Sequence, residues 1–457
     1  SSSSSSSPTS PTPTSSPVVT TQTKVEKEEV TKKCFPYGCP LLPQDVAFDS
    51  DVTEALGVIR PICNNEDSTT TQSSSSSSSE QVSVSSTLQS SGRNNAATLT
   101  LIGYKGGPIE TQINQDRAFV LNPFYFLPEE EERNSGEEQA QMLGVFDGHG
   151  RLGEVVSEYA VTTLPQLLST KLGDIFKHKD ENKEEEEEVI QRAISESFLE
   201  IDETIPTAGV GGCTASVVLH IPSSSSSSKI YIANAGDSRS FIATHYKSTT
   251  SSQTQSKSYT NIIYATREDK AHLSEERTRI EQNGGTILTY DDDENDSRVL
   301  YTKGKYQMSL AMSRSIGDWE FGEIGVIAKP IVDSLIVEDV VRKEVERLRL
   351  LLQEEDGMAC VDDGEEEEDG EEKTCQVIEE QDVRVFAVSA TDGLLDFIAP
   401  DVLMSTIAAS LFRDDDEPSL CLFSSMEKLI YSAAKGWHDE MDGEYRDDIA
   451  VAASIIR

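Results

Sequence analysis

The chain has 457 residues, and its 81 Asp and Glu against 39 Lys and Arg give a formal net charge of −42. This charge argues against a nucleic-acid-binding protein, because such proteins gain most of their affinity by neutralising phosphates with Lys and Arg. Anionic membrane surfaces are disfavoured for the same reason. Apolar residues make up 36% of the chain, below the roughly 45–50% of globular domains, so part of the chain must lie outside any core.

The sequence also bears on compartment. No stretch approaches the ~18 consecutive apolar residues of a membrane span. The seven cysteines are scattered and odd in number, which is not typical of a disulfide framework and favours a reducing compartment. We therefore expect an intracellular protein, cytoplasmic or nuclear, and a monomer. The chain does not begin with Met, so its start decides nothing about targeting.

The first 95 residues are mostly Ser, Thr and Pro. Such a composition cannot bury enough apolar surface to offset the entropy of ordering the chain. We therefore predict a disordered N-terminal region over 1–95 and one folded domain over 96–457.

From residue 97 onward the pattern is that of a folded domain. Short apolar or alternating runs predict strands at 98–104, 117–121, 141–146, 212–221, 229–235, 240–244, 259–266, 383–389 and 449–456. Apolar residues at helical spacing predict helices at 155–168, 190–201, 274–283, 336–352, 399–411 and 422–436. This mixture is typical of an α+β domain in which helices cover antiparallel sheets from outside.

Three polar segments interrupt the folded domain, and each is predicted to be a disordered insertion. The first, 222–228, is Pro222 followed by six serines, and the second is the polar loop 247–258. The third, 353–382, holds fifteen acids against one Lys. Such a charge run is usually solvated.

Four acids stand next to predicted strands. Asp147 and Asp392 each follow an apolar run and precede a glycine, whereas Asp116 and Asp447 each come just before a strand. If these strand ends meet, like charges come close together, which is unfavourable unless cations neutralise them. Carboxylates, carbonyls and water are the ligands that Mg²⁺ and Mn²⁺ prefer. Taken singly, the same acids are better explained as turn residues without a metal.

The order of seven short motifs along the chain is a further indication of function. Seven short strings occur in sequence: Asn114-Gln115-Asp116-Arg117, Val145-Phe146-Asp147-Gly148-His149-Gly150, Gly212-Cys213-Thr214-Ala215, Ala235-Gly236-Asp237-Ser238-Arg239, Ser313-Arg314-Ser315-Ile316-Gly317-Asp318, Ala390-Thr391-Asp392-Gly393-Leu394-Leu395-Asp396 and Arg446-Asp447-Asp448-Ile449. Over roughly residues 97–457 this order resembles the metal-dependent protein phosphatases of the 2C family. The resemblance implies a four-layer αββα sandwich of two antiparallel sheets flanked by helices. It also implies a binuclear Mn²⁺ or Mg²⁺ centre that hydrolyses phosphoserine and phosphothreonine in phosphoproteins.

The resemblance further implies a role for each matching residue. Asp147 matches the carboxylate that bridges the two metals, and Gly148 matches the backbone carbonyl ligand. Asp392 and Asp447 match the other ligands of the first metal, and Asp116 matches the acid that supports the second.

Three more matches complete the implied site. Asp237 and Asp396 match acids associated with a third, weaker metal in some members of the family. His149 matches the proposed general acid for the leaving alkoxide. Physically, two cations ~3.5–4 Å apart activate water and clamp the reacting oxygens, and a His titrates in the range that proton donation needs.

Two departures from the family pattern concern the metal and the phosphate. Gln115 stands where many members carry a ligating Glu, and Thr111 occupies the spacing of the expected phosphate-binding Arg. Lys105 or Arg117 is the candidate to supply the missing positive charge, although Lys acts without bidentate geometry. We therefore expect weaker substrate capture without loss of the chemistry.

The alternative from another functional class is a pseudophosphatase, in which the same fold serves as a binding or scaffold module. The loss of a ligating Asp would favour this alternative, but Asp147, Asp392 and Asp447 are present. The negative charge of the chain also predicts a preference for phosphosites in basic surroundings, which associate faster with an acidic surface at low salt.

Overall fold

The computed structural model describes residues 96–108, 111–126, 139–178, 185–206, 211–223, 227–248, 257–290, 293–356, 378–413 and 422–457. Two five-stranded antiparallel sheets form its centre. The first has the order β14-β7-β6-β3-β2 and the second the order β1-β16-β15-β8-β9. The first sheet consists of β2 (Arg117–Leu121), β3 (Gln141–Phe146), β6 (Ala215–Ile221), β7 (Lys229–Ala235) and β14 (Ile331–Ile336). The second consists of β1 (Ala96–Leu101), β8 (Arg239–Lys247), β9 (Ser258–Ala265), β15 (Arg384–Ala390) and β16 (Ile449–Ile455).

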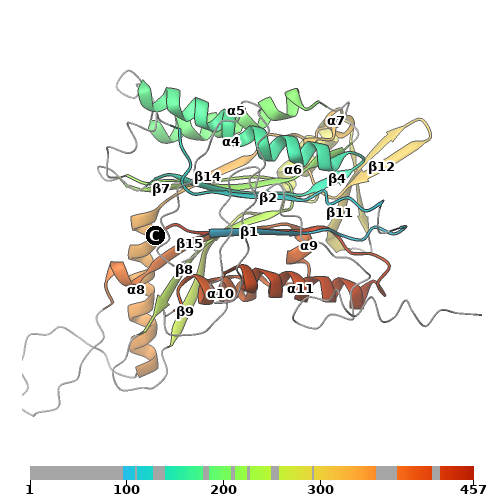
Figure 1. The fold of residues 1–457 in the computed structure, drawn as a ribbon. Coiled ribbons are helices and arrows are strands. Elements are labelled where there is room, and N and C mark those ends of the chain that lie inside the picture. The colour runs from blue at the N-terminus through green and yellow to red at the C-terminus, as the bar shows by residue number, and fades with distance from the viewer. Residues whose placement is uncertain are drawn as a thin grey trace, which may run out of the picture.

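Helices cover the outer face of each sheet, as Figure 1 shows. α4 (Gly153–Lys177) and α5 (Glu186–Thr204) lie over the first sheet, and α10 (Pro400–Leu411) and α11 (Leu422–Glu440) lie over the second. The predicted αββα sandwich is therefore confirmed. Among the described helices, none combines the length and the apolarity that crossing a bilayer requires.

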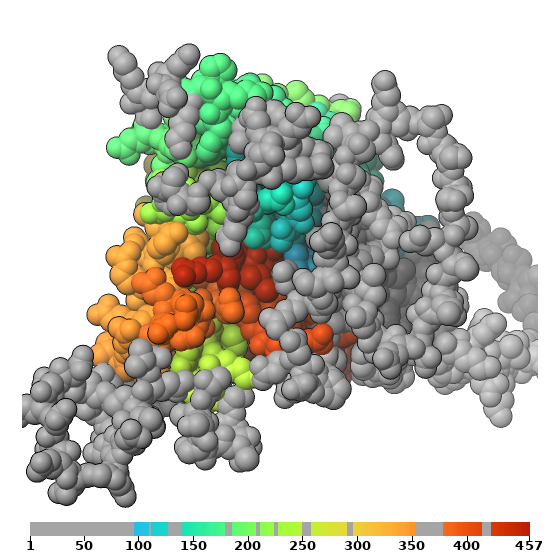
Figure 2. Space-filling model, turned by 60° about the vertical axis from the view of Figure 1, so that its left-hand side comes forward, coloured from blue at the N-terminus to red at the C-terminus, as the bar shows by residue number. Residues whose placement is uncertain are grey.

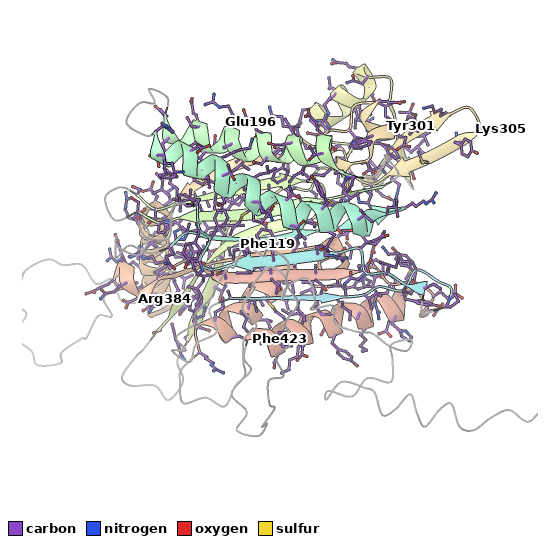
Figure 3. All side chains as sticks on the ribbon, turned by 45° about the horizontal axis from the view of Figure 1, so that its top comes forward. Phe119, Glu196, Tyr301, Lys305, Arg384 and Phe423 are labelled. Atoms are coloured by element: carbon purple, nitrogen blue, oxygen red, sulfur yellow. The ribbon has the colours of Figure 1, made fainter. Side chains whose placement is uncertain are left out.

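Burial explains why these segments fold as layers. Strands such as β6, whose seven residues are all buried, are covered on both faces. Phe119, fully buried, lies within the sandwich in Figure 3, whereas Glu196 lies on the outer helical layer. A second apolar cluster joins the second sheet to α10 and α11, with Leu403 and Ile430 fully buried in it.

A smaller unit projects from one end of the sandwich, and the sequence patterns did not predict its strands. β10 (Thr286–Tyr290), β11 (Asp293–Lys303) and β12 (Tyr306–Leu310) form a three-stranded sheet beside α6 (Ser274–Gln282) and α7 (Trp319–Gly322). Its small core contains Val299, Tyr301 and Phe321. Lys305 lies at the tip of the β11–β12 hairpin in Figure 3. β14 was also missed, because its alternation is short and runs directly into a helix.

The predicted insertions are only partly described. Residues 224–226, 249–256 and 357–377 lie outside the described residues, as does the predicted disordered region 1–95. The limits predicted for the third insertion were too wide. Helix α8 (Val337–Asp356) runs past residue 353, and Ile378 is buried in the main core before a short 3₁₀ helix at Glu380–Asp382. An acidic composition does not reveal where a helix ends or where one apolar residue is buried.

Figure 2 shows α8, in light orange, beside the dark orange and red of the C-terminal strands.

Buried hydroxyl groups connect the two sheets. Ser240 on β8 lies 2.8 Å from Ser216 on β6 and 2.7 Å from Ser389 on β15, oxygen to oxygen. All three side chains are fully buried. A chain of hydroxyl groups satisfies its own donors and acceptors, so the sheets are joined by directional contacts as well as by apolar packing.

A buried histidine makes the stability of the domain dependent on pH. His220 on β6 is 2% exposed, and burial lowers its pKa from 6.5 to about 4. In the unfolded chain the imidazole gains a proton near pH 6.5, but in the folded domain it does so only near pH 4. The unfolded state therefore binds more protons between these values, and this contribution to stability is lost as the pH falls through that window.

We predict that His220→Leu removes this contribution. The difference in free energy of unfolding between the variant and the wild type should move in favour of the variant by up to about 3 kcal/mol between pH 7 and pH 4. Urea unfolding at several pH values measures it, with His178→Leu at the exposed end of α4 as the control. A difference that stays constant with pH would contradict the assignment.

Candidate metal centre

The acids at the strand ends come from both sheets and meet at one edge of the sandwich. In the first sheet Arg117 pairs with Phe146, so Asp116 before β2 and Asp147 after β3 stand at the same end. In the second sheet Ala390 pairs with Val451, so Asp392 after β15 and Asp447 before β16 do the same. The antiparallel register therefore gathers four carboxylates that lie far apart in the sequence.

Several of these carboxylate oxygens are buried without a hydrogen-bond partner among the described residues. They include both oxygens of Asp116 and one oxygen of Asp392. Burial, followed by the neighbouring acids Asp448 and Asp447, raises the pKa of Asp116 well above its ordinary value. For Asp147, burial and then the charges of Asp116 and Asp392 have the same effect on the pKa. For Asp392, burial and then the charge of Asp237 raise the pKa to about 7.

Two lysines lie against this group of acids. The Lys105 ammonium is 2.9 Å from an oxygen of Asp447 and 3.2 Å from one of Asp448. Burial would lower the pKa of Lys105, but the charges of Asp448 and Asp447 outweigh it and raise the pKa above its ordinary value.

Over the described ranges, no three or more Asp, Glu, His or Cys side chains converge as a ready metal site.

The second lysine lies at Asp237. Lys270 Nζ is 2.7 Å from Asp237 Oδ2, while Asp237 Oδ1 has no partner in the described part of the chain. Asp396, at the end of α9 (Asp392–Leu395), lies close enough for the Lys270 and Asp237 charges to act on it. The two acids predicted for a third metal thus lie near each other and near the Lys270 ammonium.

Gly148 is required by the crowding around it. It begins the short strand β4 (Gly148–Gly150), and a Cβ at this position would overlap the Gln115 carbonyl oxygen and lie 2.7 Å from the Gly153 carbonyl oxygen. Its neighbour Asp147 is held by Thr214, whose side-chain hydroxyl oxygen accepts a hydrogen bond from Asp147 N at 3.0 Å. Only glycine lets the chain turn this closely against the start of α4.

Gln115, which replaces an expected glutamate, has an acid beside it. Gln115 Nε2 donates to Glu154 Oε2 and to the Gly150 carbonyl, both at 3.0 Å. The amide side chain is therefore held at the rim of the acidic group, and a carboxylate from α4 occupies the space next to it. Sequence reasoning missed Glu154, because no pattern links it to position 115.

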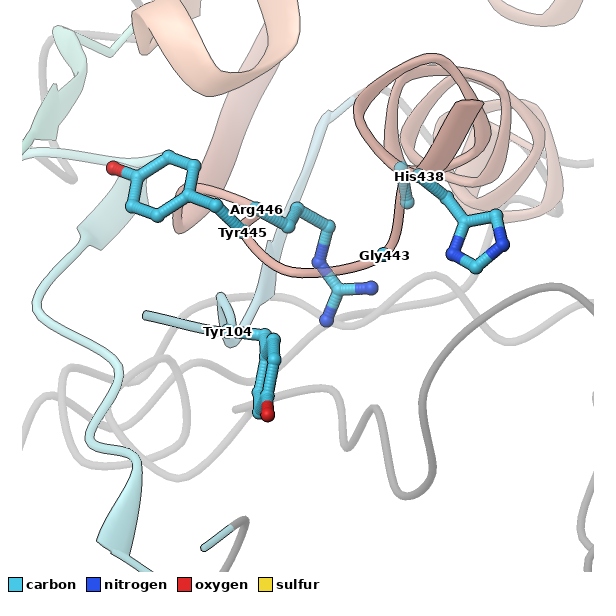
Figure 4. A pocket seen from close by; sticks show the side chains of 6 residues that line it. Tyr104, His438, Gly443, Tyr445 and Arg446 are labelled. Carbon is cyan, nitrogen blue, oxygen red and sulfur yellow. The ribbon is translucent and has the colours of Figure 1, made fainter. Parts of the chain in front are cut away.

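The loop that carries Asp447 is tied to the chain after β1. Tyr104 and Arg446 exchange two backbone hydrogen bonds of 2.7 Å, and Gly103 N donates to Asp448 Oδ1 at 2.5 Å. Arg446 also donates to the Ile102 carbonyl. Figure 4 shows this side chain in a hollow between Tyr104 and His438. Asp448 therefore serves as a structural anchor that fixes the position of its neighbour Asp447.

His149 projects from the same short strand as Gly148. Its Nε2 lies 2.6 Å from Asp318 Oδ2. Burial would lower the pKa of His149, but the charge and hydrogen bond of Asp318 outweigh it, so the pKa lies above its ordinary value. Sequence reasoning selected His149 but missed this partner, which lies 169 positions away in the chain.

The two candidates for phosphate binding differ in their surroundings. Arg117 is occupied by Glu158, at 2.7 Å from Nε, and by the backbone carbonyls of Asn114 and Asp116. Its guanidinium thus braces the turn before β2 against α4. Lys105 lies directly at the acidic group, whereas Thr111 is exposed and bonds to the Pro108 carbonyl.

Fold and site together define the class of protein: an αββα sandwich with an acidic centre at the edge where its two sheets meet. The family model of protein phosphatase 2C matches residues 111–343, which is more than half of the chain. The chain belongs to the protein phosphatase 2C family. The match ends before Asp392 and Asp447, which the second sheet brings to the centre.

Individual relatives agree with the family. The chain is 28% identical over 244 residues to probable protein phosphatase 2C 61 of Arabidopsis thaliana, covering 53% of this chain and 64% of the relative. It is 27% identical over 270 residues to probable protein phosphatase 2C 67 of Oryza sativa subsp. japonica, covering 54% and 63%. The chain thus spans less than two thirds of these relatives. A crystal structure of serine-threonine phosphatase 2C from Toxoplasma gondii aligns with a TM-score of 0.47 and 15% identity, over 79% of this chain and 94% of that one.

The crowding at Gly148 generates a stability prediction. Gly148→Ala should lower the free energy of unfolding by roughly 1–3 kcal/mol, because the added methyl group must displace backbone atoms. Gly322→Ala is the matched control, since no atom beyond its chain neighbours and its own helix backbone lies within 4 Å of the added Cβ, and its effect should stay within about 0.5 kcal/mol. Urea unfolding of both variants measures the difference. Equal stability of the two variants would contradict the described packing.

Proposed function

We propose that this protein is a metal-dependent serine/threonine protein phosphatase, which hydrolyses phosphoserine and phosphothreonine in phosphoproteins. One observation carries the proposal. Acids from both sheets are buried together at one edge, and several of their oxygens have no hydrogen-bond partner among the described residues. Buried like charges of this kind are costly unless a cation compensates them. The family of the chain supports the same conclusion.

The donor set fits two divalent ions, Mn²⁺ or Mg²⁺. We propose that Asp147, the Gly148 carbonyl, Asp392, Asp447 and Asp116 hold them, because hard oxygen donors suit these metals. When bound, the two ions would activate a water molecule for attack on phosphorus and stabilise the charge on the phosphate oxygens. The third, weaker ion expected at Asp237 and Asp396 is less well supported, because Lys270 already compensates Asp237.

The remaining roles fall to side chains around the acids. His149 would hold the proton that the leaving serine or threonine oxygen needs. Lys105 would attract the phosphate of the substrate, since its ammonium group lies 2.9 Å from Asp447 Oδ1 at the acidic centre. Arg117 is a weaker candidate for that role, because its guanidinium is committed to Glu158 and two carbonyls. No specific observation favours the alternative of a binding or scaffold module.

The metal requirement is tested by removing either the ions or a ligand. Hydrolysis of a phosphothreonine peptide should depend on added Mn²⁺ or Mg²⁺, disappear with EDTA and return when metal is restored. Asp147→Asn should lower kcat/KM by roughly a hundredfold or more, because the positions of both ions depend on this side chain. The control is Asp333→Asn on β14, whose carboxylate binds the Tyr264 hydroxyl. Turnover that persists in EDTA would refute the proposal.

The role of Lys105 is tested with saturating metal. Lys105→Ala should raise KM for a phosphothreonine peptide by about tenfold, since the variant lacks the positive charge that attracts the substrate phosphate. A smaller change is expected in kcat. Lys171→Ala is the control, because Lys171 pairs with Glu200 on the outer helical layer. If Lys105→Ala leaves both KM and kcat unchanged, Lys105 does not contact the phosphate.

A further inference from the structure

The first turns of α4 hold Gln115 by its side chain and by its backbone. Gln115 Nε2 donates to Glu154 Oε2 at 3.0 Å, and Ser157 donates its hydroxyl to the Gln115 carbonyl at 2.6 Å. Glu154 and Ser157 are three positions apart on the helix, so they lie on the same face. The helix therefore fixes where Gln115 lies beside the acids of the centre.

Both hydrogen atoms of the Gln115 amide are used in these contacts. One is donated to Glu154 Oε2 and the other to the Gly150 carbonyl, each at 3.0 Å. A carboxylate and a backbone carbonyl can only accept hydrogen bonds, so the amide nitrogen must face them and the amide oxygen must point elsewhere. Among the described residues, none donates to that oxygen. Oε1 is therefore available to a group that the described chain does not supply.

The Gln115 amide lies close to the Gly148 carbonyl, one of the proposed metal ligands. A Cβ built on Gly153 would lie 2.9 Å from Gln115 Nε2 and 2.8 Å from the Gly148 carbonyl carbon. Glycine at position 153 therefore leaves the space in which these two groups meet. Both carboxylate oxygens of the next residue, Asp116, are buried without a hydrogen-bond partner in the described part of the chain. Amide and carbonyl oxygens, like carboxylates, suit Mg²⁺ and Mn²⁺.

We propose that Glu154 is the positioning residue for Gln115 and orients its amide so that Oε1 faces the metal ion at the Gly148 carbonyl. This inference rests on the proposed function, since it concerns one of the two ions of that centre. It also gives a physical reason for glutamine at position 115. An amide can bond to Glu154 and still offer an oxygen to the ion, whereas a glutamate there would bring two carboxylates into contact.

A purely structural role for Glu154 leads to different expectations. Acids in the first turn of a helix interact favourably with the helix dipole, and Glu154 occupies that position on α4. In such a role its loss would lower the stability of the domain, leave metal affinity unchanged and be independent of the residue at position 115. Measurements of metal binding therefore separate the two roles.

Calorimetric titration of the metal-free full chain with Mn²⁺ alone measures the affinities without turnover. Glu154→Ala should weaken the binding of one ion by roughly tenfold, as is typical when a residue that orients a metal ligand is removed. Glu200→Ala on α5 is the matched control, because Glu200 pairs with Lys171 on the outer helical layer, and it should leave both affinities unchanged. Affinities that Glu154→Ala also leaves unchanged would overturn the proposal.

A double-mutant cycle tests whether Glu154 acts through Gln115. Gln115→Ala alone should weaken the binding of one ion. Adding Glu154→Ala to that variant should weaken it by no more than about twofold further, because residues that act through one another are not additive. A multiplicative loss in the double variant would mean that the two residues act independently, and would overturn the proposal.

Exchanging the two side chains tests the contact without deleting it. Gln115→Glu alone places two carboxylates at a contact of 3.0 Å, so the urea midpoint of the metal-free chain should fall. Combining it with Glu154→Gln restores one donor and one acceptor with their positions reversed. The midpoint and the Mn²⁺ affinities of this double variant should return at least to wild-type values. A midpoint that the single variant leaves unchanged, or that the exchange does not restore, would overturn the proposal.

Failure of this inference and failure of the proposed function give different results. If the wild-type chain binds no Mn²⁺ and hydrolyses no phosphothreonine peptide, the metal centre is refuted and the inference is refuted with it. If the wild type binds two ions and hydrolyses the peptide, while Glu154→Ala binds both ions as tightly, only the role of Glu154 is refuted.

Discussion

The arrangement of this domain depends on the burial of several carboxylates at the edge where two sheets meet. Isolated charges are strongly disfavoured in such a place, and like charges that lie close together are more so. The structure accepts this cost at Asp116, Asp147 and Asp392, whose pKa values are all raised by burial and by the charges of neighbouring acids. Features that otherwise look like local irregularities become intelligible as supports for these acids.

The supports are mostly backbone contacts and small side chains. Gly103 and Gly148 let backbone segments approach where any Cβ would collide with neighbouring chain. Thr214 bonds to both the backbone N–H and the carbonyl of Asp147. Further from the acids, the hydroxyl chain through Ser240 links the first sheet to the second. A site whose ligands come from both sheets requires that the two sheets keep a fixed position relative to each other.

Much of the fold was predictable from the sequence, because both sheets and their helices have regular apolar patterns. The strands predicted at 117–121 and 141–146 coincide with β2 and β3, and the helix predicted at 274–283 matches α6 to within a residue. The projecting sheet β10–β12 was missed, since the alternation in β12 covers only five residues, four of which are exposed. Its stability derives from packing against α6 and α7, which a local pattern does not contain.

For the candidate site, the sequence predicted the acids but not the residues that contact them. Asp116, Asp147, Asp392 and Asp447 were selected because each adjoins a strand, and the structure brings them together; their roles as ligands remain predictions. The partners Asp318, Lys270 and Glu154 were missed as partners. Each acts through a contact across the fold rather than through a neighbour in sequence. Contacts of this kind depend on side-chain positions that only the folded chain defines.

The balance of charge at the centre bears on how many ions it can hold. Seven carboxylates gather there: Asp116, Asp147, Asp237, Asp392, Asp396, Asp447 and Asp448. Lys105 and Lys270 supply two compensating charges, which leaves five negative charges. Two divalent ions would reduce that excess to one, whereas a third would reverse its sign and would have to compete with Lys270 for Asp237. With all seven carboxylates ionised, this balance supports the proposal of two ions, with the Lys270 ammonium compensating Asp237 where a third cation would otherwise bind.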